Sequence, residues 1–139
     1  MAVYTEVSEG EAAALLHALN LGELTALRGI EGGIENTNYF VTSTAGEWVL
    51  TLFERLTHAQ LPFYLHLMKH LAQHGVPVPD PQAKPEGARV PSGEDDLLHT
   101  VCGKPAALVN RLHGKSELTP GTAHCTAVGA MLARAHLAT

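Results

Sequence analysis

The sequence of 139 residues has little positive charge and no long apolar run. Lys and Arg number 9 against 14 Asp and Glu, which gives a formal net charge of −5, and the basic residues form no run. Binding to a nucleic-acid backbone requires a basic patch, so this composition argues against nucleic acid as a partner. No apolar stretch approaches the roughly 20 residues that cross a bilayer. The start, MAVYTEVSEGE, also lacks the basic and apolar regions of a signal peptide. We therefore expect a cytoplasmic protein that contacts no membrane.

Cysteine is scarce as well, and recognisable catalytic motifs are absent. Cys102 and Cys125 are the only two cysteines and lie far apart in the sequence, which excludes a disulfide framework and a paired metal knuckle. There is no Gly-x-Ser-x-Gly elbow, and no catalytic loop in which an Asp is followed some residues later by an Asn. The sequence therefore predicts no catalytic residue and no functional metal site within this chain.

The pattern that remains is that of one globular domain with a core, since hydrophobic residues make up 45% of the chain. Ser8 and Glu11 have the spacing of a capping box, and Gly22 can close the helix that follows. The apolar face of this helix consists of Ala12, Leu15, Leu16 and Leu19. A second helix is predicted in AQLPFYLHLMKHLAQHG, which ends at Gly75; its apolar face is formed by Leu61, Leu65, Met68 and Ala72.

Strands are predicted between and after these helices. TNYFVTS and EWVLTLFE flank the turn-like TAG and predict a hairpin, to which LRGI adds a further strand. Residues 76–95 contain five of the 8 prolines and must be extended or looped. Gly103-Lys104 divides a second hairpin, and a last helix begins near TPGTAHC, with Thr119 as its cap and Pro120 in its first turn. Hairpins placed between helices indicate an α+β fold with an antiparallel sheet.

The histidines give two structural predictions. His66, His70 and His74 recur every four residues, so they share one face of the second helix. A divalent metal could bind such a stripe, but this face lies opposite the apolar one, and we interpret it as solvated. His136 shares a face with Cys125 and the apolar residues of the last helix, which predicts a buried, hydrogen-bonded histidine.

The stretch RGIEGGIENTNYFV contains more glycine and asparagine than a hairpin turn needs. Glycine allows backbone N–H groups to approach a phosphate closely, and a loop between two strands can cover a nucleotide. The stretch matches neither the dinucleotide-binding fingerprint nor the phosphate loop that ends in Lys-Ser/Thr. From the residues alone, both a structural turn and a nucleotide lid remain open.

Several motifs together resemble the N-terminal part of bacterial homoserine kinases of the aminoglycoside-phosphotransferase-like, protein-kinase-like type. GIENTNYFV and VLTLFE are the specific ones, GKPAALVNRLHG and HCTAVGAMLARAHLA follow in the same order, and the likeness covers essentially the whole chain. The resemblance implies a kinase-like N-lobe with an antiparallel sheet of about five strands flanked by helices. The nucleotide-binding lobe would span residues 1–112, with the linker between lobes at 108–112, and residues 113–139 would begin the C-terminal lobe.

The same resemblance implies transfer of the γ-phosphate of ATP to the hydroxyl of L-homoserine, a step in threonine biosynthesis, with Mg2+ neutralising the phosphates. The nucleotide-side candidates it implies are Gly32, Gly33, Glu35, Asn36, Asn38, Thr51, Val109, Asn110, Arg111 and Leu112.

Two departures from kinase-like lobes accompany the resemblance. Thr51 stands where such lobes usually place a lysine that holds the α- and β-phosphates, and the second helix has no Glu to pair with one. The catalytic loop and the metal-binding Asp of the C-terminal lobe are also missing, which suggests a truncated chain. We expect negligible kinase activity from residues 1–139 alone, and self-association through an exposed face of the last helix. Two alternatives remain: another small-molecule kinase acting on choline, methylthioribose or an aminoglycoside, and a non-catalytic nucleotide-binding or interaction module.

Overall fold

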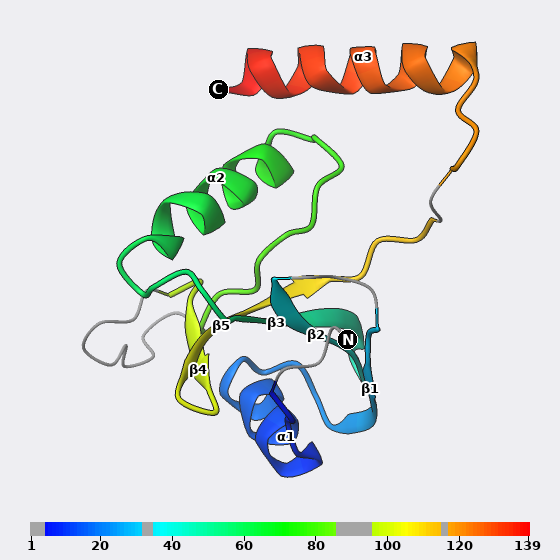
Figure 1. The fold of residues 1–139 in the computed structure, drawn as a ribbon. Helices are drawn as coiled ribbons and strands as arrows, with labels where there is room; N and C mark the ends of the chain where they lie inside the picture. The colour runs from blue at the N-terminus through cyan, green and yellow to red at the C-terminus, as the bar shows by residue number, and fades with distance from the viewer. Residues whose placement is uncertain (1–4, 32–34, 86–95, 115–116) are drawn as a thin grey trace.

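The computed structural model describes residues 5–31, 35–85, 96–114 and 117–139. Five antiparallel strands form one sheet in the order β1-β2-β3-β5-β4. Helix α1 lies on one side of this sheet and α2 on the other, while α3 lies beyond α2 (Figure 1). The elements are α1 Glu9–Ala18, β1 Leu24–Gly29, β2 Asn36–Ser43, β3 Gly46–Phe53, α2 Leu61–Gln73, β4 His99–Val101, β5 Lys104–Asn110 and α3 Thr122–Ala138. The predicted α+β class with an antiparallel sheet is confirmed.

Helix α1 begins as its sequence predicts and ends earlier. The side chain of Ser8 accepts a hydrogen bond from the N–H of Glu11, and the Glu11 carboxylate accepts one from the N–H of Ser8, which completes the capping box. At the other end Asn20, rather than Gly22, is the first residue with left-handed geometry (φ 56°). The N–H of Leu21 then donates to the carbonyl of Leu16 (2.9 Å), so the helix closes at Ala18.

Both predicted hairpins are present. Ser43 pairs with Gly46 across the turn between β2 and β3. The second turn consists of Cys102 and Gly103, both with positive φ (54° and 74°), so Lys104 belongs to strand β5 rather than to the turn. The extended segment after α2 also joins the sheet, since Pro81 forms a bridge to Val109.

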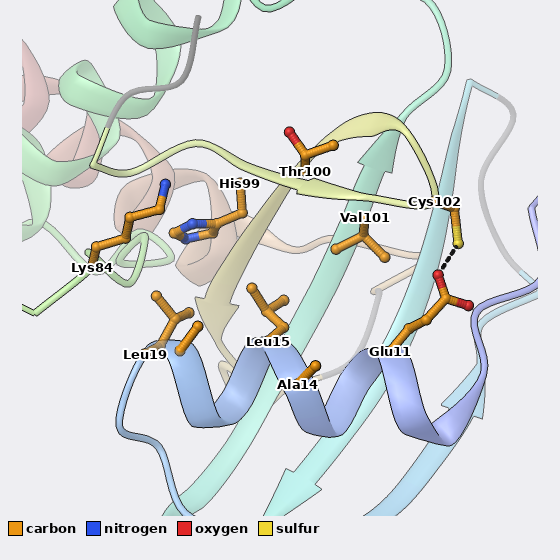
Figure 2. Close-up of a pocket in the computed structure, with 10 residues that line it drawn as sticks. Glu11, Ala14, Leu15, Leu19, Lys84, His99, Thr100, Val101 and Cys102 are labelled. Atoms are coloured by element: carbon orange, nitrogen blue, oxygen red, sulfur yellow. Dashed lines mark hydrogen bonds between the residues drawn. The ribbon is translucent and has the colours of Figure 1, made fainter. Parts of the chain in front are cut away.

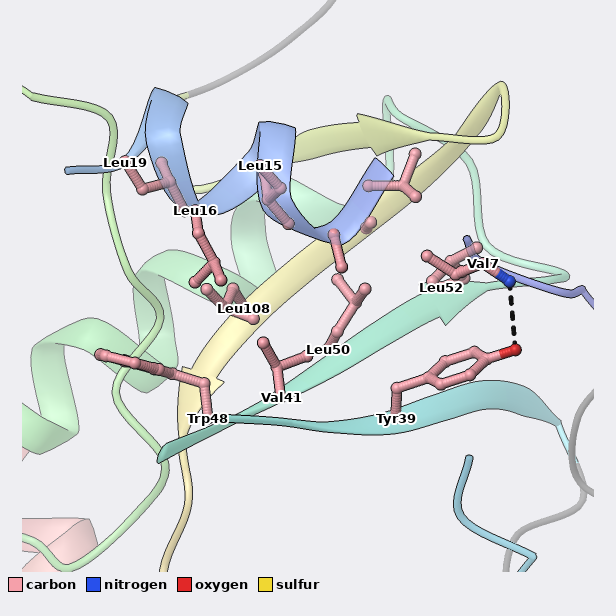
Figure 3. Packing of buried hydrophobic residues seen from close by; sticks show 13 residues of the cluster. Val7, Leu15, Leu16, Leu19, Tyr39, Val41, Trp48, Leu50, Leu52 and Leu108 are labelled. Atoms are coloured by element: carbon pink, nitrogen blue, oxygen red, sulfur yellow. Dashed lines mark hydrogen bonds between the residues drawn. The ribbon is translucent and has the colours of Figure 1, made fainter. Parts of the chain in front are cut away.

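The main core lies between α1 and the sheet. Strand β2 alternates, with Thr37, Tyr39, Val41 and Ser43 buried and the residues between them partly exposed. Leucines of α1 pack onto the buried side of β2, β3 and β5, and the hydroxyl of Tyr39 accepts a hydrogen bond from the N–H of Val7 (Figure 3). The predicted apolar face of α1, Ala12, Leu15, Leu16 and Leu19, is buried in full.

A polar cluster lies at one edge of this core, where β2 begins and β3 ends. Glu54 forms an ion pair with Lys104 across β3 and β5. Its other carboxylate oxygen accepts hydrogen bonds from the hydroxyls of Thr5 and Thr37, each at 2.7 Å. Burial opposes ionisation of Glu54, but the hydrogen bonds from Lys104, Thr5 and Thr37 outweigh it and lower the pKa of the carboxyl. The cluster therefore fixes β2, β3 and β5 to the N-terminal segment.

A groove of about 320 Å3 runs between α1 and β4 (Figure 2). At one end the thiol of Cys102 donates to the carboxylate of Glu11 (2.8 Å). This hydrogen bond, with burial and the negative charge of Glu11, raises the pKa of Cys102 to about 11. Since the thiolate is the reactive form, Cys102 should be a poor nucleophile even though its residue is exposed.

We predict that alkylation at pH 8 modifies Cys125 well before Cys102. A rise of about two units in the pKa of Cys102 lowers its thiolate fraction roughly a hundredfold. Mass spectrometry of iodoacetamide time courses measures both sites in one sample, and both cysteines are exposed. Glu11→Gln should speed the reaction of Cys102 and leave that of Cys125 unchanged. Equal rates in the unmodified chain would contradict the assigned hydrogen bond.

Helix α2 packs as predicted through Leu61 and Leu65, which contact Leu97, Leu98 and Ala107, and it ends before Gly75 (φ 80°). Of the histidine stripe, His66 and His74 are exposed and His70 is partly buried. The described ranges contain no group of three or more His, Cys, Asp or Glu side chains arranged to hold a metal ion.

Helix α3 corrects two predictions. Its N-cap is Gly121, whose N–H donates to Nδ1 of His124 (2.9 Å), so Thr119 is not the cap and Pro120 precedes the helix. His136 is exposed rather than buried, because α3 meets the rest of the described chain only near its C-terminal end, where Arg134 donates to the carbonyl of Gly75 (2.6 Å). Among the described residues, none of the helices is long and apolar enough to span a bilayer.

Candidate nucleotide-binding face

The side of the sheet opposite α1 is only partly covered. Helix α2 covers the region around Phe53 and Ala107. The rest, which we call the open face, carries residues that alternate with the buried ones and are partly or fully exposed. Strand register places them side by side: Arg28 opposite Phe40, Asn38 opposite Thr51, Phe40 opposite Val49, and Val49 opposite Val109. Residues from four strands thus meet on one exposed surface.

A hydrogen bond between two predicted site residues lies on this face near the start of β2. The hydroxyl of Thr51 donates to Oδ1 of Asn38 (2.7 Å), and the amide nitrogen of Asn38 points toward the carbonyl of Asn36 (3.5 Å). The Thr51 hydroxyl therefore orients the Asn38 amide. It brings no charge, so a phosphate bound here would need a cation from elsewhere.

The glycine-containing loop leaves the sheet directly beside Asn38. The N–H of Ile30 donates to the carbonyl of Asn38 (2.9 Å), so pairing between β1 and β2 continues to the base of the loop. Gly32 and Gly33 lie outside the described residues. Glu35 is exposed and precedes β2, and Asn36 is the first residue of that strand. The three described residues predicted from this motif thus lie together at the loop end of the open face.

The residues of the predicted linker at 108–112 have side chains on both sides of the sheet. Val109 lies on the open face, while Asn110 is turned away, since its Oδ1 accepts from the N–H of Asp80 (2.6 Å). The N–H of Arg111 donates to the carbonyl of Glu47 (3.1 Å), which extends the β3–β5 pairing by one residue. Leu112 is 47% exposed. The side-chain amide of Asn110 therefore holds the segment around Asp80, which leaves only its backbone as a candidate for the nucleotide side.

Three residues of the open face, Arg28, Phe40 and Val49, were not predicted. Two arginines lie close to the Phe40 ring. The distance from Cζ to the centroid of this ring is 5.0 Å for Arg28 and 4.0 Å for Arg111. A shallow pocket of about 420 Å3 adjoins this stack and is lined by Arg28, Gly29, Ile30, Glu31 and Phe40. The signal in the sequence was the strand alternation, because Phe40 follows Asn38 by two residues and so shares its face.

Residues 26–139 match the phosphotransferase enzyme family, and the chain belongs to that family. The matched range begins within β1 and includes the other four strands of the sheet in full. Among curated relatives, the homoserine kinase of Polaromonas naphthalenivorans (strain CJ2) is 62% identical over 138 residues, which cover 99% of this chain and 41% of that protein. The homoserine kinase of Burkholderia multivorans (strain ATCC 17616 / 249) is 55% identical over 138 residues, with 99% of this chain and 39% of the relative covered. The chain thus spans about two fifths of the length of these relatives.

Proposed function

We propose that the chain is the nucleotide-binding part of a homoserine kinase, which transfers the γ-phosphate of ATP to the hydroxyl of L-homoserine in threonine biosynthesis. The observation that carries this is the identity of 62% over 138 residues with a protein of that name. The open face supports it as well, because it combines the asparagines at the start of β2 with an apolar strip formed by Val49 and Val109. A cytoplasmic location, where ATP is abundant, accords with this role.

The arrangement suggests how each part of ATP would be held. The aliphatic side chains of Val49 and Val109 offer an apolar surface for the adenine ring beside Phe40. The N–H of Arg111 is paired with Glu47, so the backbone groups of Leu112, which follow that pair, are the ones that can meet the hydrogen-bonding edge of the base. The phosphates would then extend toward Asn36 and Asn38 at the start of β2. The resemblance implies that Gly32 and Gly33 would let backbone N–H groups approach them.

The chemical step needs groups that the described residues do not provide. Magnesium binds through carboxylate and similar oxygens, and no metal-holding cluster occurs among the described side chains. As the resemblance to homoserine kinases implies, we place the metal ligands and catalytic base outside this chain, with residues 1–112 forming the nucleotide lobe and 113–139 beginning the next. Mg2+ would arrive with the nucleotide. The chain alone should show negligible transfer.

The test is a kinase assay on the product of the complete reading frame that encodes this sequence. We expect homoserine-dependent ADP release that far exceeds release with choline, methylthioribose or an aminoglycoside. The 139-residue chain assayed in parallel should release ADP no faster than buffer. Turnover with a different acceptor would replace homoserine in the proposal, and turnover by the short chain would contradict the division of lobes.

Self-association of the 139-residue chain remains a prediction. The apolar face of α3 is uncovered in the described structure, with Val128 59% and Leu132 54% exposed. Two copies could bury these faces against each other. Light scattering tests this, and a monodisperse monomer at high concentration would contradict it.

A further inference from the structure

The open face has a neutral residue at the position where kinase-like lobes hold a phosphate with a lysine. The Thr51 hydroxyl is already engaged with Asn38 (2.7 Å). The nearby lysines are engaged too: Lys104 pairs with Glu54 on the buried side of the sheet, and Lys69 on α2 pairs with Asp80 (2.9 Å). If this face binds ATP, its phosphates need another cation.

We propose that Arg28 supplies that cation and binds the phosphates of ATP directly. The proposal rests on the proposed function, since it assigns a residue to the same nucleotide site. Arg28 is the penultimate residue of β1, so its side chain leaves the sheet beside the base of the loop at 30–36. Its register partner is Phe40, which lies two residues from Asn38, or about 7 Å along the strand. An arginine side chain can cover that distance.

The charges around the Phe40 ring favour Arg28 over Arg111. Arg111 has a partner in the carboxylate of Glu47 (3.9 Å) and a half-buried side chain. Arg28 is exposed, and no described carboxylate lies within ion-pair distance of its guanidinium. Two guanidinium groups near one ring repel each other, and a bound anion would relieve that repulsion. Of the two guanidinium groups beside the ring, that of Arg28 is therefore the one without a carboxylate partner among the described residues.

We place the phosphate chain in the pocket of about 420 Å3 beside Arg28. The guanidinium of Arg28, a planar fork of N–H donors, lies over the Phe40 ring with its Cζ 5.0 Å from the centroid. A planar fork of this kind binds two phosphate oxygens at once. Glu31 lines the same pocket and opposes an anion there. Arg28 should therefore favour the binding of ATP in this pocket and Glu31 should oppose it, so replacing each residue should change the affinity in opposite directions.

The experiment is a calorimetric titration of the 139-residue chain with ATP and, separately, with adenosine. Adenosine lacks the phosphates and reports the base subsite alone. We expect Arg28→Gln to lower the affinity for ATP about tenfold, the scale of one charge-assisted hydrogen bond, and to change that for adenosine less than twofold. Arg28→Lys should reduce the affinity for ATP less than Arg28→Gln does, because it keeps the charge. Glu31→Gln should bind ATP a few-fold more tightly.

Two further arginines serve as controls. Arg134→Gln removes the same charge from α3 and should change neither affinity. Arg55 is exposed just after β3, and if Arg55→Gln rather than Arg28→Gln removes the preference for ATP, the proposal is wrong. Equal losses for ATP and adenosine in Arg28→Gln would also overturn it, since they would indicate a structural role on Phe40. If the unmodified chain binds neither compound, the proposed function falls as well.

Discussion

Replacement of Glu54 by Gln is expected to destabilise the fold by about 2–3 kcal/mol at pH 7, the cost of breaking a set of charged hydrogen bonds in a mostly buried site. The Glu54 side chain is 14% exposed and accepts from Lys104, Thr5 and Thr37. A glutamine keeps the shape but loses the charge, and its NH2 group faces donors. Urea unfolding followed by circular dichroism measures the change.

The same carboxyl should make stability depend on pH. Its pKa is lowered in the folded state, so the stabilisation is complete above the unfolded pKa of about 4.3 and is lost as pH falls through the lower folded value. The unmodified chain should therefore lose stability in that acidic range, and Glu54→Gln should lose less. Glu23→Gln is the matched control, because Glu23 pairs with His17 at an exposed site and should change stability by less than about 0.5 kcal/mol. A Glu54→Gln variant as stable as the parent would refute the role of the cluster.

Truncation of two adjacent residues of β3 should affect different properties, stability for one and ligand binding for the other. Leu50 is fully buried against α1, and Leu50→Ala should cost about 2–5 kcal/mol through the cavity it leaves. Val49 points to the open face and is partly exposed. Val49→Ala should cost less stability and weaken adenosine binding several-fold, since it removes apolar surface from the proposed adenine subsite.

Thermal unfolding and adenosine titration of both variants make the comparison, with the Leu50→Ala titration run well below its melting temperature. Alternation along β3 places Leu50 in the core and its neighbour Val49 on the proposed ligand-binding face. If both variants bind adenosine like the parent, the adenine ring does not lie on this face. If Val49→Ala unfolds as readily as Leu50→Ala, the side opposite α1 is not open.

Local signals in the sequence predicted most of the fold. The capping box of α1 and the two hairpins depend on residues close together in the chain, so their patterns are visible without tertiary structure. The surroundings of α3 could not be predicted in the same way. Periodicity indicated that His136 shares a face with apolar residues, but whether that face is buried depends on what packs against it. The described chain covers little of α3, and the histidine is exposed.

The candidate site shows the same division. Glycine and asparagine identified the loop end, and the residues Asn36, Asn38 and Thr51 do lie together there. Arg28 and Phe40 escaped prediction because their meeting depends on the register between β1 and β2, which neither strand specifies alone. The resemblance named Asn110 as part of a linker whose backbone could meet the nucleotide, and that stays a prediction. The contact of its side chain with Asp80 depends on tertiary structure and was not visible in the sequence.

Hydrogen–deuterium exchange of the 139-residue chain, with and without millimolar ATP, tests most directly whether a phosphate-bearing ligand occupies the sheet surface away from α1. We predict slower exchange in peptides covering residues 28–41 and 107–112, with α1 and α3 unaffected. Protection confined to the groove between α1 and β4, or none at saturating nucleotide, would contradict the assignment.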